Sequence, residues 1–144
     1  MGSVQSASVG ADVPFCIQGG RCLCTGIGDI LTPLPQEEKL YFAVAKGKDG
    51  LSTPEMYRRA DAVRDTWSKP DREGYYNDFA PVAEAVLPEI AYLRTRLTAM
   101  GATVAMMTGS GSAVFGIFET LRQAQSAAEI LGEEGYFAAS CESL

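Results

Sequence analysis

The chain has 144 residues, 47% of them hydrophobic, which is enough to fill the core of one domain of ordinary size or of one small domain plus part of another. Eighteen acidic against twelve basic residues give a net charge of −6, which argues against a surface for nucleic acid or an anionic membrane. No stretch approaches the roughly 18 apolar residues of a membrane span, and the first residues lack a basic and apolar leader. We therefore expect a globular, cytoplasmic protein that acts on small molecules.

The cysteines are predicted to be reduced, buried thiols. They are Cys16, Cys22, Cys24 and Cys141, and the chain has no histidine. A zinc site would need four ligands at tighter paired spacing, and disulfides are rare in chains without secretory features. We therefore predict no metal site.

A single charge, Asp12, stands in the stretch Gly10–Phe15. It follows Gly-Ala and precedes Val-Pro, where a helix would begin, because Asp is a favoured N-cap and proline is tolerated in a first turn. Alternatively, this lone carboxylate among apolar neighbours is a general base for a hydroxyl nucleophile. The residues alone leave both interpretations open.

A β-hairpin is predicted next. Two short apolar runs, Arg21–Thr25 and Ile30–Leu34, flank a turn that contains two glycines. Prolines end the hairpin, and a polar connection follows it. We place the border between two structural units there, with one unit at 1–36 and the other at 37–144.

The second unit is predicted to alternate strands and helices. A strand over 40–45 precedes a helix that begins at Ser52 or Thr53 and ends before Pro70, with Met56, Ala60, Val63 and Trp67 on one face. Asn77 can cap the next helix, which Pro88 interrupts. A stripe at helical spacing then runs to Gly101 and consists of Ile90, Leu93, Leu97 and Met100.

Two strands, a helix and a last strand complete the pattern. The strands are Thr103–Met107 and Ala113–Phe118, and the second is apolar on both faces and should be central in its sheet. The helix opens with a capping box at Thr120 and closes at Gly132, and a strand over 136–140 follows. The order predicts an α+β chain in which the hairpin precedes a ferredoxin-like (βαββαβ) antiparallel sheet with helices on one face.

The turn between the two middle strands is rich in glycine and serine. Glycines let a backbone approach an anion and point several N–H groups at it, and Ser110 adds a hydroxyl donor between Gly109 and Gly111. A glycine-rich hairpin turn without a ligand is the more common use of such a stretch. Both interpretations stay open at this point.

The Gly-Ala-Asp-Val-Pro-Phe stretch, the pair Gly19-Gly20 and the segment 26–34 together resemble the 4-diphosphocytidyl-2-C-methyl-D-erythritol kinases of the GHMP kinase superfamily. Such enzymes use ATP and Mg²⁺ to phosphorylate a cytidine-diphosphate-linked sugar alcohol in non-mevalonate isoprenoid biosynthesis. The resemblance implies that Asp12 is the catalytic base. It also implies that Gly109, Ser110 and Gly111 line the site beside the phosphates, as in the third motif of the family.

The resemblance extends to Tyr57, because family members carry an aromatic residue just after a Thr-Pro pair that stacks on the cytosine. A half-buried helix tyrosine is the alternative for Tyr57. The segment Asn77-Asp78-Phe79 also resembles a family pattern, and we assign it to helix capping rather than to a site.

The resemblance spans only about the C-terminal half of such a kinase, so that residues 1–36 would be the end of its N-terminal domain and 37–144 its C-terminal domain. An early lysine, the upstream cytidine-binding residues and the main glycine-rich ATP loop have no counterpart here. We expect the chain to be inactive alone, with the missing N-terminal half as its partner. The alternatives are a non-catalytic ferredoxin-like small-molecule-binding module and another GHMP kinase of the homoserine or mevalonate type.

Overall fold

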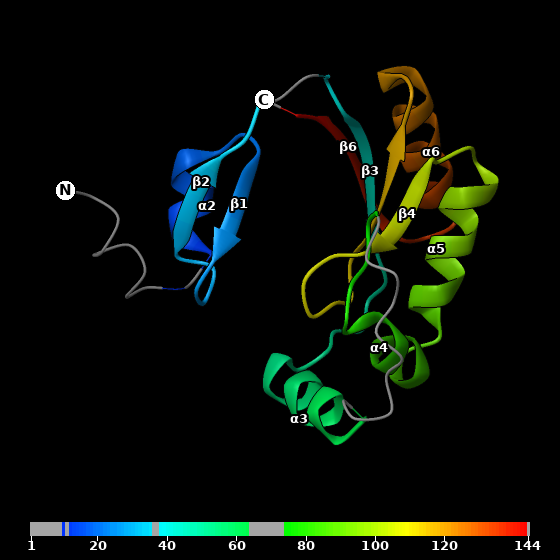
Figure 1. Ribbon diagram of the computed structural model, residues 1–144. Coiled ribbons are helices and arrows are strands. Elements are labelled where there is room, and N and C mark those ends of the chain that lie inside the picture. Colours follow the sequence, from blue (N-terminus) through cyan, green and yellow to red (C-terminus); the bar gives the residue numbers. More distant parts are fainter. Residues whose placement is uncertain (1–9, 11, 36–37, 64–73, 144) are drawn as a thin grey trace. The chain divides into compact units, whose positions relative to one another are not determined.

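The computed structural model describes residues 10, 12–35, 38–63 and 74–143 (Figure 1). The chain separates into two compact units. The hairpin unit comprises the residues up to Lys39 together with the last two residues, and the sheet unit comprises Leu40–Glu142. Their assignment to two domains of a kinase stays a prediction.

The hairpin unit contains a short helix and the predicted hairpin. Helix α2 spans Val13–Gln18, and strands β1 (Cys22–Thr25) and β2 (Ile30–Pro33) pair antiparallel, with Thr25 opposite Ile30. The four-residue turn between them needs its glycines, because Gly26 has φ +71° and Gly28 has φ +101°. The hairpin is therefore confirmed, with strands slightly shorter than predicted.

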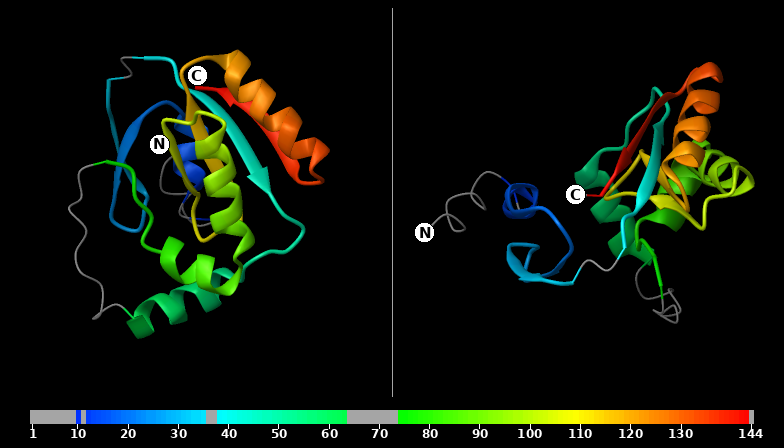
Figure 2. Two further views of the ribbon diagram at one scale, coloured as in Figure 1. Left: turned by 90° about the vertical axis from the view of Figure 1, so that its right-hand side faces the viewer. Right: turned by 90° about the horizontal axis from the view of Figure 1, so that it is seen from above.

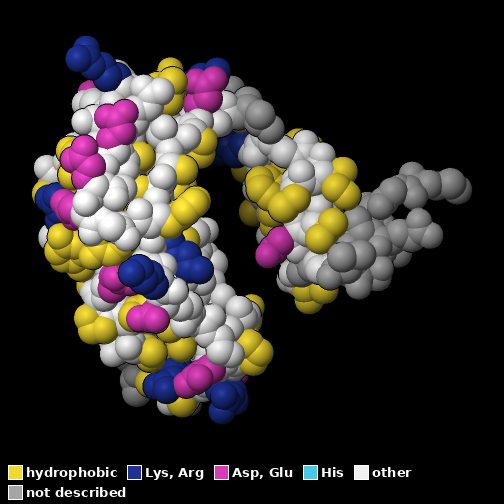
Figure 3. Space-filling view, turned by 180° about the vertical axis from the view of Figure 1, so that it is seen from behind, with side chains coloured by type: hydrophobic (Ala, Val, Ile, Leu, Met, Phe, Trp, Pro, Cys, Tyr) yellow, Lys and Arg dark blue, Asp and Glu magenta, His cyan; other side chains and the backbone are white. Residues whose placement is uncertain are grey.

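Large hydrophobic side chains remain exposed on the hairpin unit, and Figure 3 shows such side chains gathered there. They include Phe15, Ile17, Leu23, Ile27, Ile30 and Leu34. Contiguous exposed apolar surface is typical of a face that another part of a protein covers.

The sheet unit is built on four antiparallel strands in the order β4-β5-β3-β6. They span Tyr41–Lys46 (β3), Val104–Met107 (β4), Val114–Phe118 (β5) and Phe137–Glu142 (β6). Strand β5 lies between β4 and β3. The prediction that it is central is confirmed, and the strand order is that of a ferredoxin-like sheet.

The described residues of this unit form four helices: α3 (Thr53–Val63), α4 (Ala80–Val86), α5 (Glu89–Ala99) and α6 (Leu121–Glu133). The two longest described helices near the sheet, α5 and α6, cover one of its faces (Figure 2). The core lies in this layer, where Ala43 and Ala45 of β3 are fully buried with Leu93, Leu97 and Leu131 from the helices. The α+β fold class and the one-sided helix layer are thus confirmed.

One glycine of the sheet is required by this packing. A Cβ added to Gly116 would stand 3.0 Å from the Cβ of Ala102 and 3.3 Å from that of Leu97. A side chain there would push the end of α5 away from β5, so glycine lets helix and strand approach closely.

Local sequence determines where α6 begins and where it ends. Thr120 and Gln123 form the predicted capping box, with each side chain accepting the backbone N–H of the other residue. The predicted end at Gly132 is wrong, since the helix runs to Glu133. The left-handed residue is Gly135 (φ +94°), and its N–H and that of Tyr136 close a Schellman-type end.

The predicted buried residues are observed only in part. Met56 is buried in α3 as predicted, whereas Trp67 and the predicted helix end before Pro70 lie outside the described residues. The cysteines are free, but they are not buried: three are exposed and Cys22 is partly exposed. For Cys141 the physical reason is its place opposite Phe42, on the sheet face away from the buried Ala43.

Within the described ranges, no helix has the length and apolar character needed to cross a bilayer.

Replacing Thr120 with alanine should lower the free energy of unfolding by about 0.5–2 kcal/mol, because the N–H of Gln123 loses its acceptor. Thr95→Ala is the matched control: Thr95 is exposed in the interior of α5 and donates to the carbonyl of Ala91, and alanine has the higher helix propensity. Urea unfolding measures both variants. Equal stability of the two would show that the capping box does not stabilise α6.

Candidate functional site

The glycine loop, residues 108–112, joins β4 to β5. Its ends are closed by two backbone hydrogen bonds, from Thr108 N–H to the Ala113 carbonyl (2.9 Å) and from Gly111 N–H to the Thr108 carbonyl (3.1 Å). Gly109 and Gly111 have φ of +55° and +92°, in the left-handed region that favours glycine. Within the described ranges, no backbone acceptor is bonded to the N–H groups of Gly109 and Ser110. These N–H groups are available to an anion.

A side chain at position 111 would crowd its neighbours as well as strain the backbone. A Cβ there would lie 2.8 Å from Sδ of Met107 and 3.0 Å from Cδ1 of Leu51. The residues around the loop therefore pack directly against its backbone.

Two hydroxyl groups fix the loop to the segment that leads into α3. Ser112 is almost fully buried, and its hydroxyl donates to the backbone carbonyl of Asp49 at 2.7 Å. The hydroxyls of Ser110 and Thr53 are hydrogen-bonded at 2.8 Å. Thr53 is the first residue of α3, so the loop and the start of this helix are held together.

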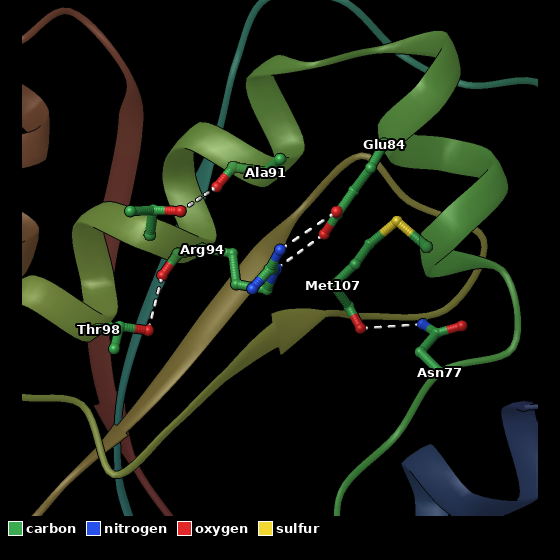
Figure 4. A network of polar contacts seen from close by, with 7 residues as sticks. Asn77, Glu84, Ala91, Arg94, Thr98 and Met107 are labelled. Atoms are coloured by element: carbon green, nitrogen blue, oxygen red, sulfur yellow. Dashed lines mark hydrogen bonds and ion pairs between the residues drawn. The ribbon is translucent and has the colours of Figure 1, made fainter. Parts of the chain in front are cut away.

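Asn77 provides a further anchor that sequence reasoning missed. Its Nδ2 donates to the carbonyls of Met107 and Gly109, each at 2.9 Å, and Figure 4 shows the first of these bonds. Its Oδ1 accepts the N–H of Phe79, so the predicted role at the start of a helix is met only in part, because α4 begins at Ala80. The resemblance of this segment to a family pattern was the one available signal.

Tyr57 of α3 lies beside the same segment. Its ring packs edge to face against that of Phe79, with centroids 4.9 Å apart and planes at 80°. More than half of the Tyr57 surface remains exposed (57%), so the side chain is accessible to a ligand. Stacking on a base stays a prediction.

An ion pair holds the helix that follows this segment. Arg94 of α5 donates to both carboxylate oxygens of Glu84 in α4, at 2.8 and 3.2 Å (Figure 4). The hydrogen bonds from Arg94 to Glu84 raise the pKa of this guanidinium, whereas its burial opposes the shift. The contact fixes α4, which begins directly after Phe79, against α5.

Asp12 belongs to the hairpin unit and precedes α2. It occupies the N-cap position with φ −84° and ψ −11°, but its side chain makes no cap hydrogen bond. Of the two interpretations of Asp12, the side-chain cap is therefore not the one observed, because the residue has helical backbone angles whereas a capping side chain needs extended ones. The carboxylate is exposed and is not used by the helix.

The sheet unit thus brings together Tyr57, Gly109, Ser110 and Gly111, with Asn77 and Thr53 between them. An antiparallel sheet that presents a glycine loop with free N–H groups beside an exposed aromatic ring is an arrangement suited to binding an anionic, aromatic small molecule.

The family model described as GHMP kinases C terminal matches residues 60–136, slightly more than half of the chain. The chain belongs to the GHMP kinase family, and the matched residues include the glycine loop. It is 37% identical to the 4-diphosphocytidyl-2-C-methyl-D-erythritol kinase of Desulfitobacterium hafniense (91% of this chain, 51% of the relative) and 35% identical to that of Rhizobium johnstonii (92% and 48%). A crystal structure of 4-(cytidine 5'-diphospho)-2C-methyl-D-erythritol kinase matches with a TM-score of 0.73 and 28% sequence identity. The match covers 94% of this chain and 53% of that chain. The chain spans about half the length of these proteins.

The two loop serines should differ in their effect on stability. Ser112→Ala removes the hydrogen bond of an almost fully buried hydroxyl to the Asp49 carbonyl and should cost about 0.5–1.5 kcal/mol of unfolding free energy. Ser110→Ala removes a hydrogen bond at the surface, where water can replace the hydroxyl, and should cost no more than about 0.5 kcal/mol. Thermal and urea unfolding of both variants check this. A Ser110 variant as unstable as the Ser112 variant would contradict the assignment of Ser112 as the buried anchor.

Proposed function

We propose that the chain is the C-terminal portion of an ATP-dependent kinase that phosphorylates the hydroxyl of 4-diphosphocytidyl-2-C-methyl-D-erythritol, a step of non-mevalonate isoprenoid biosynthesis. Membership of the GHMP kinase family supports the reaction class. The assignment of the substrate is supported by sequence identity, because more than a third of the aligned residues are identical to those of a kinase of that name. The observation that carries the proposal in the structure is the glycine loop with its two unbonded N–H groups.

Asp12 is the proposed general base. It would accept the proton of the substrate hydroxyl as the oxygen attacks the γ-phosphorus of ATP, and the bond from this phosphorus to the leaving ADP oxygen breaks. Its carboxylate suits this role because no helix N–H occupies it. Mg²⁺ would enter with ATP and neutralise charge on the phosphates.

The glycine loop would bind phosphate groups, and Tyr57 would bind the cytosine of the substrate. The N–H groups of Gly109 and Ser110 would donate to phosphate oxygens, and Gly111 permits the loop to fold this closely. The exposed ring of Tyr57 would stack on the cytosine.

The hairpin unit is proposed to be the end of the kinase's N-terminal domain. Its exposed hydrophobic side chains and the share of the relatives that the chain spans both support this assignment. An N-terminal half would then cover these side chains and supply the main ATP loop, and the 144-residue chain alone would not transfer phosphate.

Asp12→Asn tests the base. In a complete kinase that joins this chain to the N-terminal half of a matched relative, kcat should fall by about 10²- to 10⁴-fold with KM little changed, because the amide keeps the shape of the carboxylate but accepts no proton. Asp29→Asn is the matched control, since it makes the same change in the hairpin turn, where Oδ1 accepts the N–H of Ile27. An unaltered kcat for Asp12→Asn, with chemistry limiting the rate, would remove Asp12 as the base.

Tyr57→Ala tests recognition of the cytosine. Loss of stacking should cost about 1–3 kcal/mol, which is roughly a 5- to 150-fold rise in KM for the cytidine substrate, whereas Tyr57→Phe should be nearly silent. Phe137→Ala, which removes an exposed ring from β6, controls for the loss of an aromatic side chain. Steady-state kinetics with the cytidine substrate varied measures all three. Equal KM values for Tyr57→Ala and Phe137→Ala would exclude a role in stacking.

A further inference from the structure

The residues Asn77–Phe79, here called the bridge segment, contact both elements to which a binding role is proposed. The side chain of Asn77 bonds to the glycine loop, and the ring of Phe79 packs on Tyr57. The two residues are themselves joined, because Oδ1 of Asn77 accepts the N–H of Phe79 at 2.9 Å. Three consecutive residues therefore link the loop to the aromatic ring.

An amide side chain is needed for this set of contacts. Asn77 uses its NH₂ group as donor to two carbonyls, those of Met107 and Gly109, and uses its oxygen as acceptor. A carboxylate of the same shape has acceptors only and would face two carbonyl oxygens. The residue type is thus fixed by hydrogen bonding rather than by helix capping.

The bond to Gly109 also sets the direction of the N–H group proposed to bind phosphate. The peptide between Gly109 and Ser110 is trans, so the N–H of Ser110 points opposite to the carbonyl of Gly109. Because Nδ2 of Asn77 holds that carbonyl at 2.9 Å, the N–H of Ser110 is turned away from Asn77. The same argument applies to Met107, whose carbonyl is held while the next N–H, that of Thr108, closes the loop.

We propose that the bridge segment is a positioning element, in which Asn77 fixes the direction of the Ser110 N–H and Phe79 fixes the ring of Tyr57, so that phosphate and cytosine are bound at a set spacing. The identity of the two ligand groups rests on the proposed function. The Arg94–Glu84 ion pair supports the element by holding α4, which starts at its end.

Amide hydrogen exchange in the 144-residue chain tests the part that Asn77 plays, without any ligand. In Asn77→Asp the protected N–H groups of Thr108 and Gly111 should exchange at least about fivefold faster, because two hydrogen bonds to the loop are lost. The N–H groups of Ala43 and Ala45 in β3 should be unchanged. Gln125→Glu, the same amide-to-acid change at an exposed position of α6, should leave both sets unchanged.

Asn77→Ser is a second variant, to be used in case Asn77→Asp does not fold. Its hydroxyl can still accept the N–H of Phe79 but cannot reach both carbonyls. It should reproduce the faster exchange at Thr108 and Gly111. Unchanged exchange at these two residues would overturn the proposal. So would equal acceleration of the loop and of β3, which would show general destabilisation in place of local positioning.

Kinetics of the complete kinase test the positioning of ligands. Asn77→Ser should lower kcat about tenfold or more, with KM for the cytidine substrate within about twofold, because a displaced loop misplaces the phosphates. Phe79→Leu should instead raise that KM at least about fivefold and leave kcat nearly unchanged. If both variants change kcat and KM alike, the proposed division of roles is wrong. If the unsubstituted kinase is inactive, the proposed function fails, and the exchange rates alone still decide whether Asn77 positions the loop.

Discussion

The pair of hydrogen bonds from the Asn77 amide to the carbonyls of Met107 and Gly109 connects the parts of the candidate site in the sheet unit. Glycine makes the loop possible, yet glycine also leaves it free to adopt many conformations. A long-range amide reduces that freedom by holding two carbonyls, and trans peptide geometry then directs the N–H groups of Thr108 and Ser110 away from it. Without these two bonds the glycine loop would keep its closing backbone bonds and its serine contacts, but the N–H of Ser110 would lose the constraint on its direction.

The fold holds in place both the glycine loop and the segment that carries Asn77. Strand β5 is held on both sides by β4 and β3, so the loop between β4 and β5 starts and ends on fixed residues. Helices α5 and α6 bury one sheet face, and Gly116 lets the end of α5 approach β5 closely. The Arg94–Glu84 pair fixes α4 to α5 and thereby fixes the segment that carries Asn77. Packing, charge and backbone geometry thus act on the same loop.

Much of this could be predicted from the sequence, because the signals are local. The apolar character of both faces placed β5 inside the sheet, the Thr120–Gln123 spacing predicted a capping box, and glycines between apolar runs predicted the hairpin. The contacts of Asn77 could not be predicted, because its partners lie 30 and 32 residues away and Asn-Asp before a helix is equally typical of a cap. The burial of cysteines was mispredicted because exposure depends on which layers cover a strand, and residue type does not determine those layers. The roles of Asp12 and Tyr57 stay predictions.

Phosphoryl transfer by a complete kinase tests the proposed function most directly. This chain would be joined to the N-terminal half of the Desulfitobacterium hafniense relative, and release of ADP and formation of the phosphorylated product would be followed with either 4-diphosphocytidyl-2-C-methyl-D-erythritol or homoserine as the acceptor. We predict transfer to the hydroxyl of the cytidine substrate and none to homoserine. Transfer to homoserine alone, or no transfer while the intact relative is active in the same assay, would contradict it.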